Sequence, residues 1–245
     1  ARAHAFPFKR VKERRLWKPG EYIHSDGRGY FVRSFSGKRY RFLYIDDTTG
    51  YIWFKPVAEQ TEQPDMYREV LADARSKSGN QLRVFKADGG GCYTSDHFRS
   101  ILNDDLVSLE LSAPHAQQQN GVAENRNRYI DESAAAMMAH AGDMPPIFWA
   151  EAMNCATFIH NNAQWVEEVP GSKTYTTRHA WLCNSKKTFD QEQLRTFGCL
   201  VYFYVPNTEA RDGPYGPTRL KAKRGIFVGY AKGMKAYRIY DPRKR

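Results

Sequence analysis

Cysteine is scarce in this chain, and no run of apolar residues is long. Only four cysteines occur in 245 residues, with no C-x-x-C pair and no paired histidine spacing. That pattern excludes a disulfide framework and a zinc knuckle, and it favours reduced thiols in an intracellular protein. A mean hydropathy of −0.69 argues against a transmembrane span, and the first residues lack the hydrophobic segment of a secretory signal. We therefore expect neither a secreted nor a membrane protein.

Acidic residues are few at both ends of the chain. Residues 1–20 carry seven Lys/Arg and one Glu, a net +6, and residues 206–245 carry eleven Lys/Arg and three Asp/Glu, a net +8. The stretch between them has 19 basic and 23 acidic residues, so the chain totals +10. Two basic ends around a mildly acidic middle indicate a polyanion partner, most economically nucleic acid. Solubilising ends without a partner are the alternative.

Short runs of aromatic and β-branched residues alternate with helical stretches. Strands are expected at 21–26, 29–36, 40–47, 51–58, 81–88 and 106–114, and helices at 65–79, 95–104, 122–140 and 147–163. Residues 115–121 have no apolar periodicity and are expected to form a mobile loop, and 162–196 give no firm prediction. Further strands are expected at 197–205, 225–231 and 236–242. This order favours an α/β domain followed by a small all-β unit.

An acidic middle in a nucleic-acid-binding protein suggests that some carboxylates hold metal ions. Mg²⁺ takes oxygen ligands, and two such ions about 3.5–4 Å apart can drive an in-line displacement at phosphorus. Asp26 closes the first expected strand, Asp88 closes the strand before three glycines, and Glu124 lies in the first turn of a helix. A single surface carboxylate is usually solvated and has no function. The interpretation therefore depends on all three acids together and on the residues around them.

The trio lies within an ordered series of motifs. They are HSD at 24–26, FLYIDDTTGYIWFKP at 42–56, KADGGG at 86–91, QQNGVAENRNRYIDE at 118–132, FWAEAMNCATFIHN at 148–161, LRTFGC at 194–199 and GIFVGYAKGMKAYRIYDP at 225–242. Together they resemble a copia-type LTR-retrotransposon integrase over nearly the whole chain. The most specific part is QQNGVAE, with 35 residues between Asp88 and Glu124.

The resemblance implies a fold, a division into domains and a site. The fold would be a ribonuclease-H-like mixed five-stranded sheet flanked by helices, followed by a small SH3-like β-barrel. A basic leader would occupy 1–20, the catalytic core 21–193 and the SH3-like unit 194–245. Asp26, Asp88 and Glu124 would be the catalytic and metal-binding triad, with Mg²⁺, or Mn²⁺ as a substitute, and no organic cofactor.

The resemblance also implies an activity and partners. The activity would be 3′-end processing of the element's DNA, an endonucleolytic hydrolysis, followed by transfer of the 3′-hydroxyl onto target DNA. The partners would be element ends and target DNA, bound by a homo-oligomer with no membrane association. We expect action in the nucleus, after a stage in a cytoplasmic virus-like particle.

Polar and basic residues near the triad and in the C-terminal part are candidates for contacts with DNA. They are Gln118, Asn120, Arg126, Arg128, Lys221, Lys223 and Arg224. Gln118 and Asn120, with Gln119 between them, can hydrogen-bond base edges or sugars, or they can simply form a polar loop. Arg128 shares a helix face with Glu124 and could meet a phosphate, although a plain Glu–Arg helix pair is equally open.

Other conspicuous side chains have structural interpretations. Asp46 and Asp47 point to opposite faces of their strand, so only one could reach the site, and the resemblance leaves both outside the triad. His24 is expected to be structural because metal-assisted phosphoryl transfer needs no histidine base. Aromatic residues at 148, 149 and 158 recur at helical spacing and are expected in the core.

The chain departs from the family pattern at several positions. Gly89-Gly90-Gly91-Cys92 follows Asp88 where D-N-G-x-E is usual, Gly27-Arg28-Gly29 replaces a Gly-Pro pair, and Asn125 and Asn162 stand where Arg is common. The upstream zinc-binding His/His/Cys/Cys module has no counterpart in these residues, which fits either a piece of a longer product or its loss. Two alternatives to an active integrase therefore stay open. They are a decayed or domesticated DNA-binding protein and a ribonuclease-H-like nuclease that cuts without joining.

Overall fold

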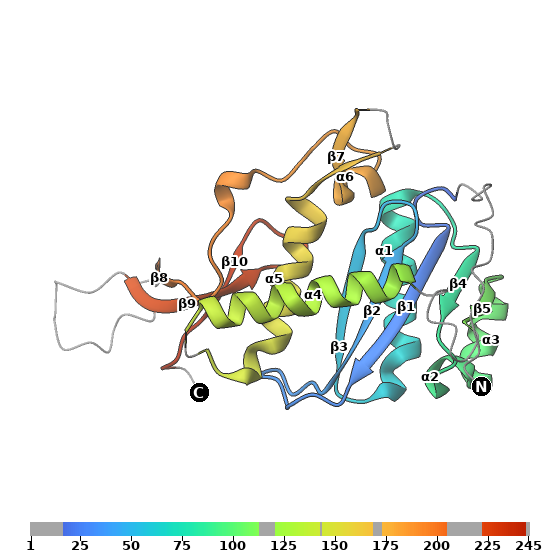
Figure 1. The fold of residues 1–245 in the computed structure, drawn as a ribbon, viewed down its shortest axis with the longest axis horizontal. Helices are drawn as coiled ribbons and strands as arrows, with labels where there is room; N and C mark the ends of the chain where they lie inside the picture. Colours follow the sequence, from blue (N-terminus) through green and yellow to red (C-terminus); the bar gives the residue numbers. More distant parts are fainter. Residues whose placement is uncertain (1–16, 113–120, 143, 169–172, 205–221, 244–245) are drawn as a thin grey trace, which may run out of the picture.

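The computed structural model describes residues 17–112, 121–142, 144–168, 173–204 and 222–243 (Figure 1). Its larger sheet has the order β3-β2-β1-β4-β5. The strands are β1 (Tyr22–Gly29), β2 (Tyr40–Asp46), β3 (Ile52–Val57), β4 (Val84–Ala87) and β5 (Ser108–Leu111). The pairs β1–β2 and β2–β3 are antiparallel, whereas β1–β4 and β4–β5 are parallel. The expected mixed five-stranded sheet is therefore present.

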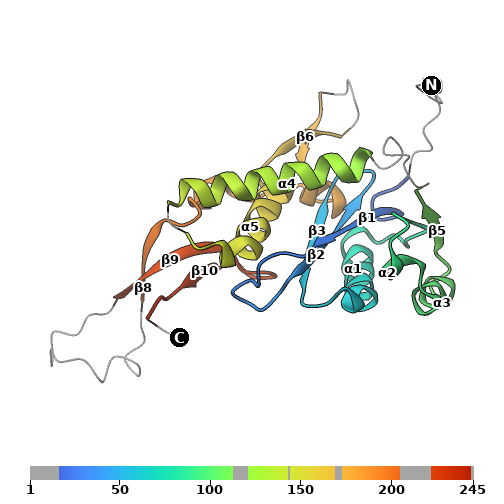
Figure 2. The same ribbon diagram turned by 60° about the horizontal axis from the view of Figure 1, so that its bottom comes forward.

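Helices cover both faces of this sheet. They are α1 (Gln63–Ser78), α2 (Gly91–Thr94), α3 (Asp96–Asp104), α4 (Gly121–His140) and α5 (Trp149–Asn162), with 3₁₀ turns η1 (Gln60–Glu62) and η3 (Pro146–Phe148) before α1 and α5. Figure 2 shows α4 and α5 on one side of the sheet and α1, α2 and α3 on the other. The side chains of β2 alternate between the two faces of the sheet, so this strand contributes apolar residues to the packing of both layers of helices. Phe42 and Tyr44 lie in the core beneath α1 and α3, while Leu43 and Ile45 lie in the core beneath α4 and α5.

Local signals set the ends of these helices. Gly79, with a φ of 71°, ends α1 in the left-handed conformation, and its N–H donates to the carbonyl of Arg75. The Ser95 side chain accepts a hydrogen bond from the Phe98 N–H at the start of α3, which confirms it as the N-cap. A proline in η3 starts the turn that leads into α5.

The prediction of a strand at 29–36 is wrong. Residues 30–39 form an irregular loop with a turn at Ser34–Gly37, where the Gly37 N–H donates to the Ser34 carbonyl. The aromatic side chains that suggested a strand pack against another element instead. Phe31 contacts Trp149, and Phe35 stacks on Phe148 with ring centroids 5.5 Å apart. Packing against the start of α5 therefore replaces pairing in a sheet.

The segment without a firm prediction forms a short sheet and a helix. Strands β6 (Trp165–Glu167) and β7 (Tyr175–Thr177) pair antiparallel, and α6 (Arg178–Leu182) and the 3₁₀ turn η4 (Gln191–Gln193) follow. The Thr177 side chain accepts from the Ala180 N–H and starts α6. These elements lie beside the C-terminal end of α5 (Figure 1).

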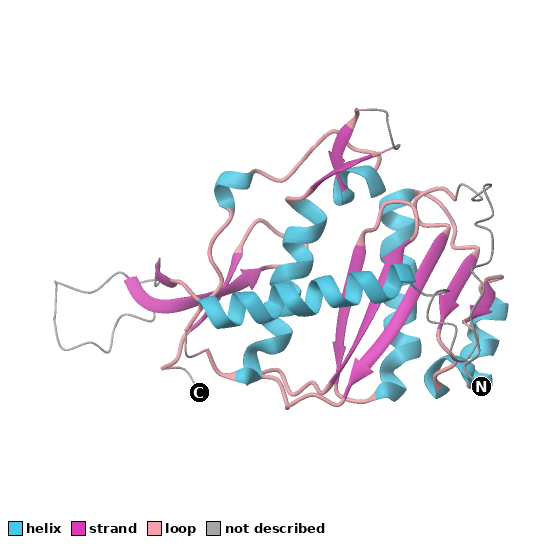
Figure 3. Cartoon of the chain, viewed as in Figure 1, coloured by secondary structure: helices cyan, strands magenta, loops and turns pink. Residues whose placement is uncertain are grey.

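The C-terminal strands form a three-stranded sheet of order β10-β9-β8. Its strands are β8 (Leu200–Tyr204), β9 (Ala222–Tyr230) and β10 (Tyr237–Tyr240), coloured as strands in Figure 3. The part of the chain that the structure describes contains this open sheet and no closed barrel. Phe227 and Val228 of β9 share a buried core with residues of β2 and α5. The division at residue 193 therefore does not separate two hydrophobic cores.

None of the helices in the described residues is both long enough and apolar enough to cross a membrane.

Candidate active site

Two of the three expected acids lie side by side at neighbouring parallel strands. Strand β1 pairs with β4 so that His24 lies opposite Lys86. Extending this register by two residues places Asp26 beside Asp88, with both side chains on the same face of the sheet. Asp26 faces α4, because its antiparallel partner Leu43 lies in the core beneath that helix. The sheet therefore brings together two carboxylates that are 62 positions apart in the chain.

The glycines after Asp88 shape the turn around its carboxylate. The Gly90 N–H donates to Asp88 Oδ1 at 3.1 Å. A Cβ at position 90 would lie 3.0 Å from the same oxygen, so a side chain there would press on the carboxylate. Gly91 then begins α2, and Tyr93 of this helix is buried. The departure from the family pattern leaves Asp88 partly exposed and held by a main-chain donor.

A polar network fixes the carboxylate of Asp26 from the side of α4. The Asn127 side-chain amide donates to Asp26 Oδ2 at 2.5 Å, and Arg28 Nε lies 3.5 Å from the same oxygen. The Asn127 carbonyl oxygen accepts from Arg41 Nη1 at 2.7 Å. Arg41 is fully buried and also contacts Asp131, which accepts from its Nη2 at 2.6 Å. Asp26 is thus positioned by buried groups as well as by its strand.

The electrostatics of the pair favour an added positive charge. Burial raises the pKa of the Asp26 carboxyl, Arg28 opposes this rise, and the negative charge of Asp88 adds to it. Burial also lowers the pKa of Arg41, against the attraction of Asp131. The second negative charge is costly where two carboxylates share a partly buried site, and a cation would reduce that cost.

Glu124 does not join the pair in this structure. It is exposed in the first turn of α4. Within the described ranges, no three His, Cys, Asp or Glu side chains are close enough together to hold a metal ion. The helix nevertheless orients Glu124 toward the site, because Asn127 is three residues further on and contacts Asp26. The resemblance named Glu124, whereas the buried Asn127 was missed.

The residues expected to contact DNA are spread over different surfaces. Gln118, Asn120 and Lys221 fall outside the described residues. Arg128 is exposed on α4, where it donates to Asn125 Oδ1 at 2.9 Å. Arg126 is half-buried and turned toward the turn between β2 and β3. Of the β9 pair, Arg224 is exposed opposite Tyr202, and Lys223 lies opposite Phe203.

The neighbouring acids of β2 serve the fold. Asp46 is fully buried, and its carboxylate accepts from the Gly20 N–H and from the N–H and hydroxyl of Thr49. Asp47 lies 2.9 Å from Nε2 of the buried His24. Both carboxylates therefore have partners away from Asp88. The core prediction also holds for Phe148 and Trp149, which are buried, and Phe158 is partly buried and packs against the same core.

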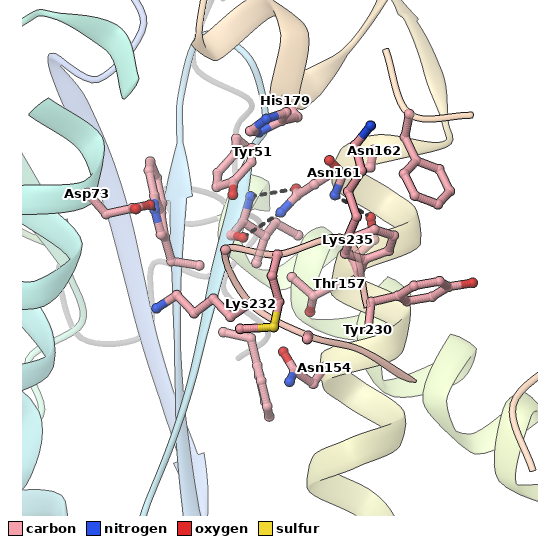
Figure 4. Close-up of a pocket in the computed structure, with 18 of the residues that line it drawn as sticks. Tyr51, Asp73, Asn154, Thr157, Asn161, Asn162, His179, Tyr230, Lys232 and Lys235 are labelled. Atoms are coloured by element: carbon pink, nitrogen blue, oxygen red, sulfur yellow. Dashed lines mark hydrogen bonds between the residues drawn. The ribbon is translucent and has the colours of Figure 1, made fainter. Parts of the chain in front are cut away.

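A cleft lies at the far edge of the sheet from the acidic pair. It has a volume of about 790 Å³ and is lined by β3, α5 and the β9–β10 connection (Figure 4). Aromatic residues and lysines, including Tyr51, Lys232 and Lys235, surround it. Its Lys77 is paired with Asp73 at 2.5 Å. Neither Asp26 nor Asp88 lines this cleft, so it is separate from the acidic pair.

Comparisons with known proteins show sequence similarity to retroelement proteins. Residues 199–245 match the family described as Retroviral polymerase SH3-like domain. The chain is 28% identical, over 99% of its length, to the Retrovirus-related Pol polyprotein from transposon TNT 1-94 of Nicotiana tabacum. It is 26% identical, over 90% of its length, to that from transposon RE2 of Arabidopsis thaliana. It covers only 17% and 14% of these two polyproteins.

A solved structure extends the likeness in fold. The simian T-cell lymphotropic virus intasome in complex with PP2A regulatory subunit B56 gamma contains a chain that superposes with a TM-score of 0.58. The alignment covers 98% of this chain and 85% of that chain at 12% identity. These findings confirm the resemblance to copia-type elements and the expected fold, a helix-flanked mixed sheet followed by an SH3-like unit.

Proposed function

We propose that this chain is the catalytic part of a retrotransposon integrase, a metal-dependent polynucleotidyl transferase. Its reaction would be processing of the 3′ ends of the element's DNA and their transfer into target DNA. The observation that carries the proposal is the Asp26–Asp88 pair on neighbouring parallel strands. The similarity to retrotransposon Pol polyproteins over almost the whole chain supports the same reaction class.

The acidic pair fits a divalent cation. It offers carboxylate oxygens, the ligands that Mg²⁺ and Mn²⁺ prefer, and its repulsion is of the kind that a cation relieves. Asp26 and Asp88 would hold the ion, and Glu124 would complete the set when DNA binds. When bound, the metal would activate the attacking oxygen and neutralise charge on the phosphate.

The chain's own residues would place DNA and keep the carboxylates in position. Asn127 and Arg28 hold Asp26, while the Gly90 N–H holds Asp88. Arg28 is 44% exposed and close enough to Asp26 to meet a phosphate there. Arg128 and Arg224 offer exposed guanidinium groups for the DNA backbone.

Three assignments complete the proposal. Gln118, Asn120, Lys221 and Lys223 would add DNA contacts. The active form would be a homo-oligomer, because joining two DNA ends to one target requires two coordinated sites. The protein would act in the nucleus, where target DNA is found.

A joining assay tests the proposal. The protein is incubated with a labelled duplex that ends in the element's terminal sequence, with Mg²⁺ or Mn²⁺, and joined products are measured. We expect joining by the wild type and its loss in Asp88→Asn, whose side-chain oxygen can still accept from Gly90. Cleavage without joining would instead identify a nuclease. DNA binding without either reaction, unchanged in Asp88→Asn, would identify a non-catalytic DNA-binding protein.

A further inference from the structure

Two arginines lie close together between α4, α6 and the turn that joins β2 to β3. Arg126 is in the first half of α4, and Arg178 begins α6. A Cβ built on Gly50 would lie 3.3 Å from Nη2 of Arg126 and 3.3 Å from Nε of Arg178. Nη2 of Arg126 and Nε of Arg178 are therefore separated by at most twice 3.3 Å. They meet where α6 and the C-terminal end of α5 approach the top of β2 and β3 (Figure 1).

The hydrogen-bonding capacity of this pair is only partly used. Arg178 is 7% exposed, and its Nη1 donates to the carbonyl of His160 at 3.0 Å and to Gln164 Oε1 at 3.2 Å. Its Nε is buried and has no hydrogen-bond partner in the described part of the chain. A buried, unpaired N–H of a charged group is costly, so this donor needs an acceptor.

Neither Arg126 nor Arg178 forms an ion pair with a carboxylate of the described residues. Burial and the charge of Arg126 lower the pKa of Arg178 to about 10. Burial and both arginines lower the pKa of the neighbouring His160 to about 3, so its imidazole is neutral at pH 7. Two like charges in a partly dehydrated site repel each other unless an anion lies between them.

We propose that Arg126 and Arg178 bind a phosphate group between α4, α6 and the β2–β3 turn. Guanidinium groups present parallel N–H donors that match the oxygens of a phosphate. Arg126 is half-buried, so the site is open to solvent on its side. The site is distinct from the acidic pair, because successive residues of a helix point about 100° apart and Asn127 is the residue that contacts Asp26. The phosphate would come from a DNA strand bound along α4 or from a free phosphate ion.

A thermal unfolding titration with inorganic phosphate tests the site. Sodium chloride at matched ionic strength separates specific binding from screening. We expect phosphate to raise the Tm of the wild type by roughly 3 °C at ten times its Kd, in a saturable way. Arg126→Gln should lose this shift and keep or raise the Tm without phosphate, because it removes a repulsive charge. Arg75→Gln, which removes an exposed guanidinium of α1 on the other face of the sheet, is the matched control and should keep the full shift.

Arg178→Lys provides a second variant, because it retains the buried positive charge but loses the planar guanidinium group and its parallel N–H donors. We expect it to fold and to show at least a threefold weaker Kd for phosphate. The proposal is wrong if phosphate stabilises the wild type no more than chloride does, or if Arg126→Gln keeps the full phosphate shift. A structural role for Arg126 would instead appear as a lower Tm with an unchanged phosphate response.

Competition with DNA identifies the source of the phosphate. The affinity of a labelled duplex is measured by fluorescence anisotropy with and without saturating phosphate, at constant ionic strength. If the site holds a DNA phosphate, inorganic phosphate weakens duplex binding to the wild type and leaves Arg126→Gln unaffected. If the site holds a free ion, the wild-type affinity for duplex stays the same. This test does not need the joining reaction, so it is independent of the proposed catalytic activity.

Discussion

Asn127 and Arg41 hold the Asp26 carboxylate through contacts that no short motif reveals. The Asn127 amide bridges Asp26 and Arg41, donating to one and accepting from the other. Asn127 and Arg41 are both fully buried, so removing Asn127 leaves Arg41 Nη1 buried without an acceptor, although Nη2 of Arg41 keeps its contact with Asp131. The geometry of the acidic pair therefore depends on a buried amide on α4 as well as on the strands.

Replacing Asn127 with alanine should destabilise the protein by about 1–3 kcal/mol, because Arg41 Nη1 would be left buried without its acceptor. Urea denaturation measures the change in the free energy of unfolding. Asn125→Ala removes an exposed amide of the same helix and should cost less than about 0.5 kcal/mol. Equal effects of the two substitutions would contradict a bridging role for Asn127.

Replacing Asp26 with asparagine should change the pH dependence of stability. The folded-state pKa of Asp26 is raised, chiefly by burial, above the unfolded value, so the native state binds more protons in the window between the two values. Wild-type stability therefore falls as pH rises through that window. Without divalent metal, we expect Asp26→Asn to be the more stable protein at pH 7, with the difference vanishing below the unfolded pKa. Thermal unfolding from pH 3 to pH 8 checks this, and a less stable variant at pH 7 would contradict it.

The sequence pointed to Asp26 and Asp88 but not to Asn127 and Arg41, which hold Asp26 in place. The reason is physical. Asp88 directly follows β4, as expected, whereas Asp26 lies inside β1, because that strand continues to Gly29 and does not end at residue 26. Arg41 is a charged residue in the otherwise apolar run 40–45, a signal that it must have a buried partner. The partner, Asn127, is 86 residues away, and only the packing of α4 on the sheet brings the two together.

At the scale of elements, the parallel pairing of β1 with β4 creates the site. The parallel register of the two strands brings Asp26, inside β1, to the same level of the sheet as Asp88, directly after β4. The composition of these segments predicted the strands, whereas the mixed sheet that pairs them was implied by the resemblance. Residues 29–36 were predicted as a strand because their aromatic residues match strand composition, and most of them lie in the loop at 30–39. Their real partners, Phe148 and Trp149, lie more than a hundred residues later and carry no local signal.

Strand β9 joins the small sheet to the core of the larger one, which makes its apolar residues important for both. Phe227 is 1% exposed in the core shared with β2 and α5. Phe227→Ala should destabilise the protein by about 3–5 kcal/mol and shift a single cooperative transition, followed by tryptophan fluorescence and circular dichroism. Tyr202→Ala, at an exposed position of β8, should have little effect. A separate early transition in Phe227→Ala would instead show that residues after 193 fold as an independent domain.

At the scale of the molecule, the net charge of +10 is best understood by its distribution. The acidic middle contains the Asp26–Asp88 pair, and basic residues lie outside it, as with Arg224 on β9. The whole-chain similarity to Pol polyproteins covers about a sixth of their length. What this chain supplies, on our account, is the cation-binding pair and surfaces for DNA.

The most direct test of that account is a calorimetric titration of the wild-type protein with Mn²⁺. We predict binding that weakens at least tenfold in Asp26→Asn and in Asp88→Asn, because each removes a charged ligand. Asp104→Asn, which changes an exposed carboxylate of α3, should bind Mn²⁺ as the wild type does. Mn²⁺ binding that is unchanged in both Asp26→Asn and Asp88→Asn would contradict the central claim that these two carboxylates form the metal site.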